Sequence, residues 1–175
     1  MISTMQLQAI CPHAGSRIAQ FIQPLNDAME KFGISTPRRQ AAFLAQCAHE
    51  SGELLYMREI ASGEAYEGRA DLGNTRSGDG PRYKGGGLIE ITGRYNYSRC
   101  GTAIGVDLEA DPELIELPAN ACMASAWWWA VHGLNELADK DCFGTITHRI
   151  NGGYNHIDER LQYWLLALKA TGAWT

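Results

Sequence analysis

The chain has 175 residues, of which 45% are hydrophobic and 20% are charged, and its formal net charge is -5 at pH 7. These values are typical of one globular domain, which at this length buries roughly 70% of its unfolded surface. The acidic balance gives no reason to expect nucleic acid as a partner, because nucleic acid favours basic patches, and it argues against purely electrostatic adhesion to an anionic cell wall.

Two further classes of protein are disfavoured. No stretch approaches the roughly 20 apolar residues of a membrane span, and the N-terminus (MISTMQLQ) lacks the basic start and apolar run of a signal peptide. The cysteines are odd in number and form no Cys-x-x-Cys pair, so we expect reduced thiols in a protein made in a cytoplasm. They are Cys11, Cys47, Cys100, Cys122 and Cys142.

The first 35 residues are predicted to form a helical arm that supplies core and no chemistry. Residues 3–12 predict a short helix, and residues 16–32 predict a second helix with one apolar face. Pro24 should bend this second helix or mark a joint, because proline removes a backbone donor. Gly33 should end it.

A third helix is predicted to begin at Thr36-Pro37, with the threonine as its N-cap and the proline in its first turn. Gly52 is a natural end, because glycine accepts the left-handed conformation that often follows a helix. One face of this helix is apolar and should pack against the core. It carries Phe43, Leu44, Cys47 and Ala48.

The end of this helix and the segment after it carry two acids, Glu50 and Glu59. On an unbroken helix they would lie roughly 13 Å apart along the axis and about half a turn apart around it. A chain that reverses at Gly52 can instead bring them to opposite walls of one groove. Two carboxylates across a groove are the minimal apparatus for cleaving a glycosidic bond.

Two other interpretations compete with the catalytic one. A glutamate near the end of an amphipathic helix is most often a solvated surface residue, and local spacing leaves that interpretation open. His49 followed by Glu50 is also how a zinc-protease helix begins, but that motif needs a histidine where this chain has Glu53. The metal interpretation therefore fails.

Residues 63–87 contain eight glycines and few apolar residues, so we expect a long loop. Such a loop is either functional or a mobile surface segment, and the sequence leaves both open. Its charged residues could pair with one another or line a groove. They are Arg69, Asp71, Arg76 and Asp79.

The alternation of residues 88–92 predicts a short strand, and the residues from about 93 to 100, or slightly beyond, predict a helix. Thr92, Tyr95 and Asn96 are residue types that bind sugars, because hydroxyls and amides form hydrogen bonds and an aromatic face covers the C–H surface of a sugar ring. These types are common, so their chemistry alone is weak evidence.

The helix predicted at 118–132 is nearly hydrophobic all round and should be central. Of its three consecutive tryptophans, at most one can face a groove, because neighbours point about 100° apart. Residues 139–150 predict a helix that leads to Asn151-Gly152-Gly153, either a simple turn or a site of close ligand approach. Residues 155–168 predict the last helix. Its expected inward side chains are Ile157, Leu161, Trp164, Leu165 and Leu168.

Three segments resemble the motifs of glycoside hydrolase family 19, in the family's order and over about residues 36–170. They are FLAQCAHESG at 43–52, YKGGGLIEITGRYNY at 83–97 and INGG at 150–153. The family contains chitinases and similar peptidoglycan-cleaving endolysins of bacteriophages. The compact length and the segment YEGRADLGN at 66–74 look more like the phage members.

The resemblance implies a mainly α, lysozyme-like, two-lobed helical domain with a small strand element beside the cleft. Residues 1–175 would form a single catalytic domain, with the helical arm at 1–35 and the family 19-like core at 36–175. No separate cell-wall-binding domain is expected, and no metal or organic cofactor is implied.

The resemblance also implies site residues. Glu50, partly shielded by apolar neighbours, would stay protonated and donate to the leaving oxygen, and the more exposed Glu59 would be ionised and activate water. That arrangement inverts the anomeric centre and needs carboxyl groups about 6.5–9.5 Å apart. Seven further residues are expected in the substrate-binding set. They are His49, Glu90, Thr92, Tyr95, Asn96, Asn151 and Arg160.

Within that set, Thr92 and Asn96 match positions that place the attacking water and the N-acetyl group, and Tyr95 and Asn151 match substrate contacts. Arg160 matches a cation that can pair with a catalytic carboxylate and keep it ionised; from its local pattern alone it would lie on a solvated helix face. These roles are implied by the family and do not follow from spacing.

The chain departs from the family at two positions. The family usually has Gly-Arg-Gly where this chain has Gly85-Gly86-Gly87, and glutamine where this chain has Glu90. Gly86 removes a cation from beside the site, and Glu90 adds a third carboxyl group. Like charges raise one another's pKa, so we expect an upward shift of the pH optimum or a lower rate.

The resulting hypothesis is an endolysin that hydrolyses β-1,4 bonds between N-acetylmuramic acid and N-acetylglucosamine in peptidoglycan. The alternatives are a chitinase acting on N-acetylglucosamine polymers, an inactive cell-wall-binding relative, and a lytic transglycosylase. We expect a monomer that is made in the cytoplasm of a bacterial host and inserts in no membrane. It would reach the periplasm after a holin opens the inner membrane.

Overall fold

The computed structural model describes residues 1–174, and these are mainly helical, as the sequence predicts. Three single-turn 3-10 helices supplement the α-helices. The elements in chain order are α1 (Thr4–Ile10), α2 (Arg17–Lys31), α3 (Pro37–Glu50), η1 (Glu64–Tyr66), η2 (Ala70–Leu72), α4 (Asp79–Arg82), α5 (Arg94–Ile104), η3 (Pro112–Glu116), α6 (Pro118–Val131), α7 (Leu134–Asp139), α8 (Phe143–Asn151) and α9 (Ile157–Thr171).

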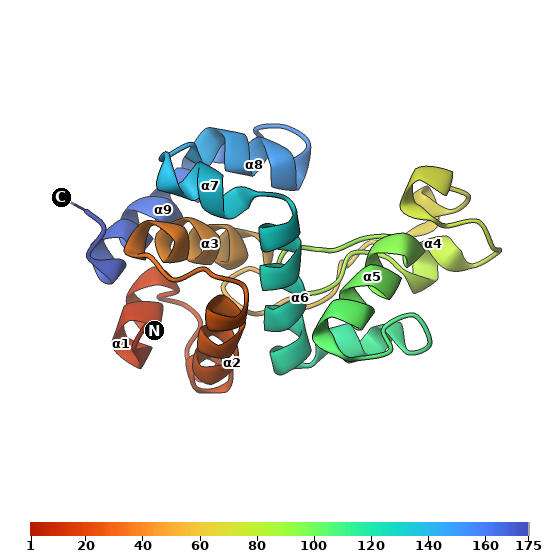
Figure 1. The fold of residues 1–175 in the computed structure, drawn as a ribbon, viewed down its shortest axis with the longest axis horizontal. Helices are drawn as coiled ribbons and strands as arrows, with labels where there is room; N and C mark the ends of the chain where they lie inside the picture. Colours follow the sequence, from red (N-terminus) through yellow and green to blue (C-terminus); the bar gives the residue numbers. More distant parts are fainter. Residues whose placement is uncertain (175) are drawn as a thin grey trace.

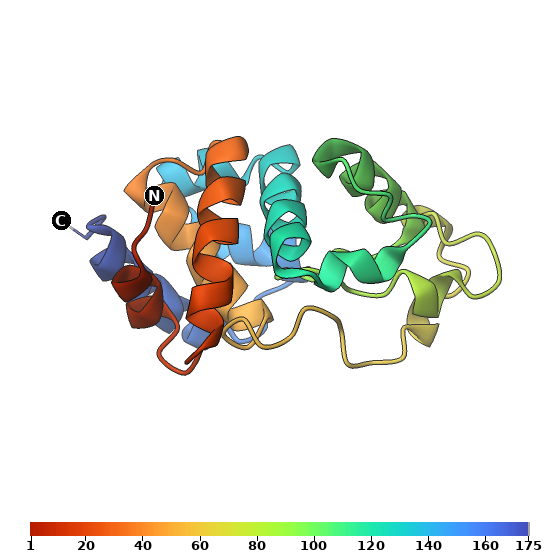
Figure 2. The same ribbon diagram turned by 90° about the horizontal axis from the view of Figure 1, so that it is seen from below.

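The helices form two lobes with α6 between them (Figure 1). The larger lobe contains α1, α2, α3, α7, α8 and α9, and the smaller lobe contains α4, α5 and the 3-10 helices; Figure 2 shows the same division from below. The chain passes from the larger lobe to the smaller lobe after α3 (Figure 2). Within the described residues, no helix is both long and apolar enough to cross a membrane.

The core is built where α3 packs against α9 and where α2 packs against α6. Trp129 of α6 is fully buried and contacts Phe43 of α3 edge-on, with ring centroids 5.4 Å apart. Trp127 is also buried, whereas Trp128 is partly exposed. The prediction that two of the three tryptophans pack in the core is therefore confirmed.

The helix boundaries follow the local signals closely. The Thr36 side chain accepts a hydrogen bond from the Arg39 backbone nitrogen at 3.2 Å, which makes it the N-cap of α3 as predicted. After Glu50 the chain leaves the helix, and Gly52 has the left-handed φ of 55° that a non-glycine residue resists. Helix α2 continues from Arg17 to Lys31 through Pro24, so the proline does not separate two helices.

Three local predictions were wrong. Residues 88–92 form a turn and no strand, because Glu90 takes a φ of 54°; the described residues contain only isolated bridges here, from Gly86 to Arg58 and Ile91. The helix predicted at 139–150 begins only at Phe143, as α8, because α7 ends at Asp139 and Asp141 then takes a φ of 55°. Leu165 is 42% exposed and does not face inward.

The packing around position 86 explains why this chain has glycine there, where the family usually has arginine. A Cβ there would lie 2.3 Å from the Tyr97 hydroxyl oxygen and 2.7 Å from Ile115 Cγ2. Tyr97 is fully buried and donates to the Lys84 carbonyl at 2.7 Å, so it cannot move aside without losing a hydrogen bond. The space that an arginine would need beside the site is therefore filled in this chain.

We expect Gly86→Ala to lower the free energy of unfolding by about 1–3 kcal/mol, because the added methyl group overpacks a filled space. Urea unfolding measures it. Gly144→Ala in α8 is the matched control, since the nearest side-chain atom to its added Cβ is 3.9 Å away; we expect no loss there. Adding Tyr97→Phe to Gly86→Ala should recover part of the stability, and no recovery would contradict the packing explanation.

Candidate functional site

Glu50 is bound to a buried arginine. Its Oε1 lies 2.6 Å from Nη2 of Arg160 on α9, and the Arg160 side chain is only 1% exposed. Arg160 also donates from Nη1 to the Gln46 side chain at 2.5 Å and from Nε to the Asn155 carbonyl at 3.1 Å. The interpretation of Arg160 as a solvated helix face is thus excluded. Its carboxylate partner is Glu50, the residue expected to act as the acid, and not Glu59, the residue expected to be ionised.

The same network fixes α3 relative to α8. The Gln46 amide donates to the Thr147 hydroxyl at 2.8 Å, and both residues are fully buried. Each of them lies one helical turn before a predicted site residue, Glu50 on α3 and Asn151 on α8. The bond therefore brings Glu50 and Asn151 to the same end of the two helices. The Asn151 side-chain oxygen is buried and has no hydrogen-bond partner among the described residues, so it is free to accept one from a ligand.

Glu59 is bound by neutral groups from the smaller lobe. Its Oε1 accepts from the Tyr66 hydroxyl at 3.0 Å and its Oε2 accepts from the Gly85 backbone nitrogen at 3.0 Å. Its own backbone nitrogen donates to the Gly85 carbonyl at 2.9 Å. Both carboxylate oxygens are thereby oriented, while the residue stays partly exposed. The burial and the Glu59 bond raise the pKa of Tyr66 to about 12, so the phenol stays a donor.

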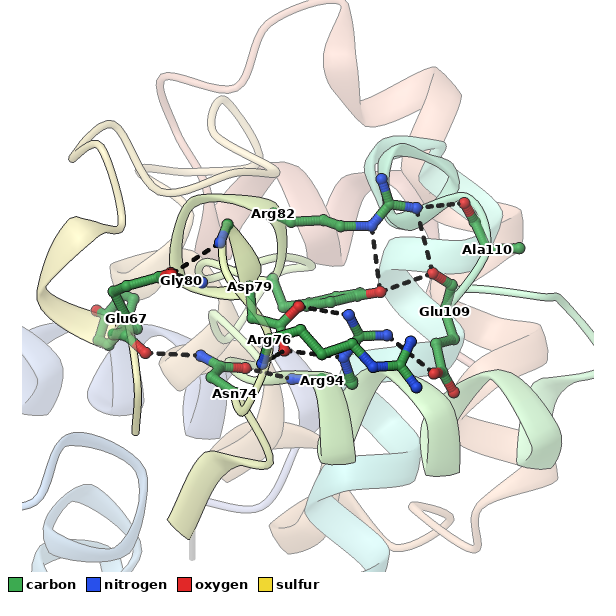
Figure 3. Close-up of polar contacts among 12 residues, drawn as sticks. Glu67, Asn74, Arg76, Asp79, Gly80, Arg82, Arg94, Glu109 and Ala110 are labelled. Carbon is green, nitrogen blue, oxygen red and sulfur yellow. Dashed lines mark hydrogen bonds and ion pairs between the residues drawn. The ribbon is translucent and has the colours of Figure 1, made fainter. Parts of the chain in front are cut away.

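The glycine-rich segment that supplies Tyr66 is tied down by hydrogen bonds, as Figure 3 shows. Asn74 is fully buried; its amide donates to the Tyr66 carbonyl at 2.9 Å and its oxygen accepts from the Arg94 backbone nitrogen at 2.8 Å. The carboxylate of Glu67 accepts from the backbone nitrogens of Gly78 and Gly80 at 2.7 and 2.8 Å. These bonds favour a fixed support for Glu59 over the mobile-loop alternative.

A second set of charges fastens this segment to α5. Asp79 is buried and forms an ion pair with Arg94, which also contacts Glu109 at 3.0 Å (Figure 3). The Arg94 hydrogen bond holds the pKa of Asp79 below its ordinary value. Arg69 pairs with Asp71, so three of the four charged residues of this segment bind protein groups; the exception is the exposed Arg76. None of these pairs includes a predicted catalytic carboxylate.

A polar pocket of about 490 Å³ opens beside these charges, but it is not the predicted site. Its lining includes Arg82 and Arg94, which are bonded to Ala110, Asp79 and Glu109 within the lobe. Neither Glu50 nor Glu59 lines it. Its lining acids are Asp107 and Glu109, and Glu109 is already paired with Arg94, so the pocket is separate from the predicted catalytic acids.

Glu90 joins the two predicted catalytic acids. Burial of its carboxyl group and, to a smaller extent, the negative charges of Glu50 and Glu59 together raise the pKa of Glu90 to about 7. Its backbone has a φ of 54°, which is uncommon for a residue with a side chain, and Gly85 lies between its Cβ and that of Glu59. Three carboxyl groups therefore interact in one place. Glu90 is the third carboxyl group that was expected beside the site from the sequence.

The raised pKa of Glu90 predicts a pH effect. Below pH 4.5 the group is protonated in both the folded and the unfolded chain; between about 4.5 and 7 only the folded chain keeps the proton. Its contribution to stability therefore falls as the pH rises through this window. We expect the melting temperature of Glu90→Gln, measured relative to that of the parent, to be higher at pH 8 than at pH 4.5. Melting temperatures at both values test this, with the exposed Glu64→Gln as control; an equal difference at both pH values would contradict it.

The remaining predicted residues lie in two groups. On the smaller lobe, Thr92 donates to the Glu90 carbonyl at 3.0 Å, Asn96 donates to the Thr92 carbonyl at 2.8 Å, and Tyr95 is 55% exposed at the start of α5. On the larger lobe, His49 lies 3.3 Å from a Glu159 carboxylate oxygen. Burial and then the Arg160 charge lower the pKa of His49 to about 4, so this contact is not an ion pair at neutral pH.

The sequence interpretation missed the groups that orient the two acids. Gln46 and Thr147 link three helices under Glu50, and Tyr66 and Gly85 bind Glu59. Gln46 has a detectable signal, since it is a polar residue within the apolar run of α3. Nothing local identifies the others, because each one acts through a partner that is distant in sequence.

Comparison with known proteins gives a consistent result. The family model described as chitinase class I matches residues 28–151. A Haemophilus influenzae protein, described as containing a glycosyl hydrolase family 19 domain, is 31% identical over 94% of both chains. The Arabidopsis thaliana endochitinase At2g43620 is 31% identical over 93% of this chain, which spans only 58% of that relative.

Solved structures agree in fold. A bacterial family 19 chitinase superposes with a TM-score of 0.81 at 22% identity, covering 98% of this chain and 95% of the other. Chitinase C from Streptomyces griseus gives a TM-score of 0.75 at 26% identity, covering 98% of this chain and 76% of the other. The arrangement of helices around the carboxyl cluster is therefore shared with these chitinases.

Proposed function

Because this chain belongs to glycoside hydrolase family 19 and is therefore a glycoside hydrolase, we propose that it is an endolysin acting on peptidoglycan. The reaction is hydrolysis of the β-1,4 bond between N-acetylmuramic acid and N-acetylglucosamine within the glycan strand. The observation that carries the proposal is the pair of differently bound carboxyl groups. Glu50 comes from the larger lobe beside a buried arginine, and Glu59 is held by two neutral donors of the smaller lobe.

In this mechanism Glu50 protonates the leaving oxygen and Glu59 activates a water on the opposite face of the sugar, so the anomeric centre is inverted. The Tyr66 and Gly85 bonds leave Glu59 acting as a base in a fixed orientation. Glu90, with a pKa of about 7, keeps a proton within the carboxyl cluster at mildly acidic pH. Asn151 offers its unpaired oxygen, and Thr92, Tyr95 and Asn96 offer sugar contacts from the other lobe.

The preference for peptidoglycan is supported by the resemblance of residues 66–74 to the phage members of the family. In this protein that segment is structural: Tyr66 binds Glu59, and Asn74 fixes Tyr66 to α5. As an endolysin of this type, the protein would be made in a bacterial cytoplasm and reach the cell wall through a holin. Expression in a Gram-negative host should cause lysis only when a holin is co-expressed.

Product analysis tests the reaction. With purified peptidoglycan we expect new reducing ends on N-acetylmuramic acid, seen by mass spectrometry after reduction, and an initial α-anomer by NMR. 1,6-Anhydro products would instead identify a lytic transglycosylase. Pelleting with cell walls without loss of turbidity would identify an inactive binding relative.

A chitinase is the second candidate, and the names of the plant relatives favour it. It uses the same carboxyl groups on a neutral polymer of N-acetylglucosamine. Release of reducing sugar from chitin and from purified peptidoglycan, compared at equal enzyme concentration, separates the two. Activity on chitin alone would overturn the endolysin proposal while leaving the two-carboxylate mechanism in place.

A further inference from the structure

An aromatic stack lies where α6 ends. The rings of Trp128 and His132 are parallel within 21° with centroids 3.8 Å apart, and both residues are partly exposed. His132 Nδ1 lies 2.7 Å from the Trp128 carbonyl oxygen, so Nδ1 carries the hydrogen and donates it. This bond fixes the imidazole over the indole.

Two exposed arginines, one from α5 and one from α8, act on this stack. Arg149 of α8 donates from Nη1 to the His132 carbonyl at 2.6 Å. Arg99 of α5 is near enough for its charge to act on His132: burial lowers the pKa of His132, and the Arg149 and Arg99 charges lower it further. His132 is thus neutral at pH 7, and the arginines supply the positive charge.

Neither arginine is neutralised by an ion pair. Six other arginines bind carboxylates, but no carboxylate within residues 1–174 lies within ion-pair distance of Arg99 or Arg149. Glu136 approaches the Arg149 region, since both side chains lie near Gly133, yet the two do not pair. Arg17, Arg76 and Arg82 likewise form no ion pair in the described part of the chain. Arg99 and Arg149 differ from them in lying near the end of α6, where Arg149 bonds to His132 and the Arg99 charge acts on it.

This cationic end of α6 lies next to the predicted substrate contacts. Arg99 is stacked over the Tyr95 ring, with its guanidinium carbon 5.2 Å from the ring centroid. Tyr95 precedes Asn96 in the first turn of α5. Helices α5 and α6 are in contact, and Figure 1 shows them side by side with α8 above the end of α6. Arg99 therefore lies beside a predicted substrate contact, on a helix that packs against α6.

We propose that Arg99 and Arg149, with the Trp128–His132 stack between α5 and α8, bind a carboxylate carried by the glycan strand. This inference rests on the proposed function. In peptidoglycan, N-acetylmuramic acid bears a stem peptide with free carboxylates, whereas chitin has no charge. Guanidinium groups recognise carboxylates through paired N–H donors, and the flat stack offers a surface for the apolar part of the peptide. The site makes the enzyme prefer the acidic polymer.

Kinetics with soluble peptidoglycan fragments test the site. The second substrate is the same material after its carboxyl groups are converted to amides with carbodiimide and ammonia. We expect Arg99→Gln combined with Arg149→Gln to raise KM for native fragments by about 3- to 10-fold, the range for two exposed charge pairs. The kcat should stay unchanged, and KM for amidated fragments should not respond. Arg76→Gln, which removes an exposed and unpaired arginine of the smaller lobe, is the charge-matched control.

The outcomes separate the two proposals. If the parent enzyme cleaves neither kind of fragment, the endolysin function fails, and this inference fails with it. If the parent cleaves native and amidated fragments with equal KM, or if the double variant loses affinity for both equally, only the carboxylate site is overturned. A KM increase with Arg76→Gln equal to that of the double variant would also overturn it.

Discussion

Glu50→Gln lowers kcat for glycan cleavage by about a hundredfold to ten-thousandfold in the mechanism proposed above, because that is the contribution of a positioned general acid. The amide keeps the shape of the side chain and an oxygen that can accept from Arg160, so the fold should remain. The assay is turbidity loss of outer-membrane-permeabilised cells together with reducing-end release.

The exposed Glu30→Gln on α2 is the matched control and should keep parental activity. Circular dichroism and urea unfolding confirm that Glu50→Gln is folded. A folded Glu50→Gln variant with activity within tenfold of the parent would refute the assignment of Glu50 as the acid. Loss of activity in both variants would point to the preparation and require repetition at matched folded fraction.

The second large effect is expected on stability. Arg160→Met removes the cation that bonds to Glu50, Gln46 and the Asn155 carbonyl, and it leaves the buried Gln46 oxygen and the largely buried Glu50 carboxylate without this donor. Removing one partner of a buried ion pair typically costs about 3–5 kcal/mol. We expect a loss in that range in urea unfolding, together with a fall in kcat because Glu50 loses its orientation.

A double variant isolates the pair. Arg160→Met combined with Glu50→Gln no longer leaves a buried carboxylate uncompensated, so its loss of stability should be smaller than the sum of the two single losses. Arg160→Lys keeps the charge but only one of the donors, and it should fall between the parent and Arg160→Met. Strictly additive losses, or a loss under about 1 kcal/mol for Arg160→Met, would contradict the network described here.

The sequence predicted the catalytic helix well because its limits are set locally. Thr36 caps a nearby backbone nitrogen, and Gly52 takes the conformation that ends the helix. The order of apolar residues likewise predicted a buried α6. The family resemblance singled out Glu50, Glu59 and Arg160, and the structure brings Arg160 to Glu50 and brings Glu90 into the field of both acids.

The errors came where local pattern and long-range packing disagree. Residues 88–92 alternate as a strand does, but no strand is available to pair with them, and the bridge between Gly86 and Ile91 closes them into a turn. The pattern at 139–150 has helical spacing, but Asp141 turns the chain between α7 and α8. Alternation and periodicity show which side chains are apolar. They do not show which distant segment of the chain will pair or pack with them.

By itself, the sequence determined where the main helices begin and end and which residues could do acid–base chemistry, because caps, glycines and apolar periodicity act over a few residues. Only the tertiary structure decided what surrounds each acid: a buried arginine from α9 for Glu50, a phenol and a backbone nitrogen for Glu59, and two negative charges for Glu90. The physical reason is that charge interactions and hydrogen bonds depend on distance in space, which folding sets between residues far apart in the chain.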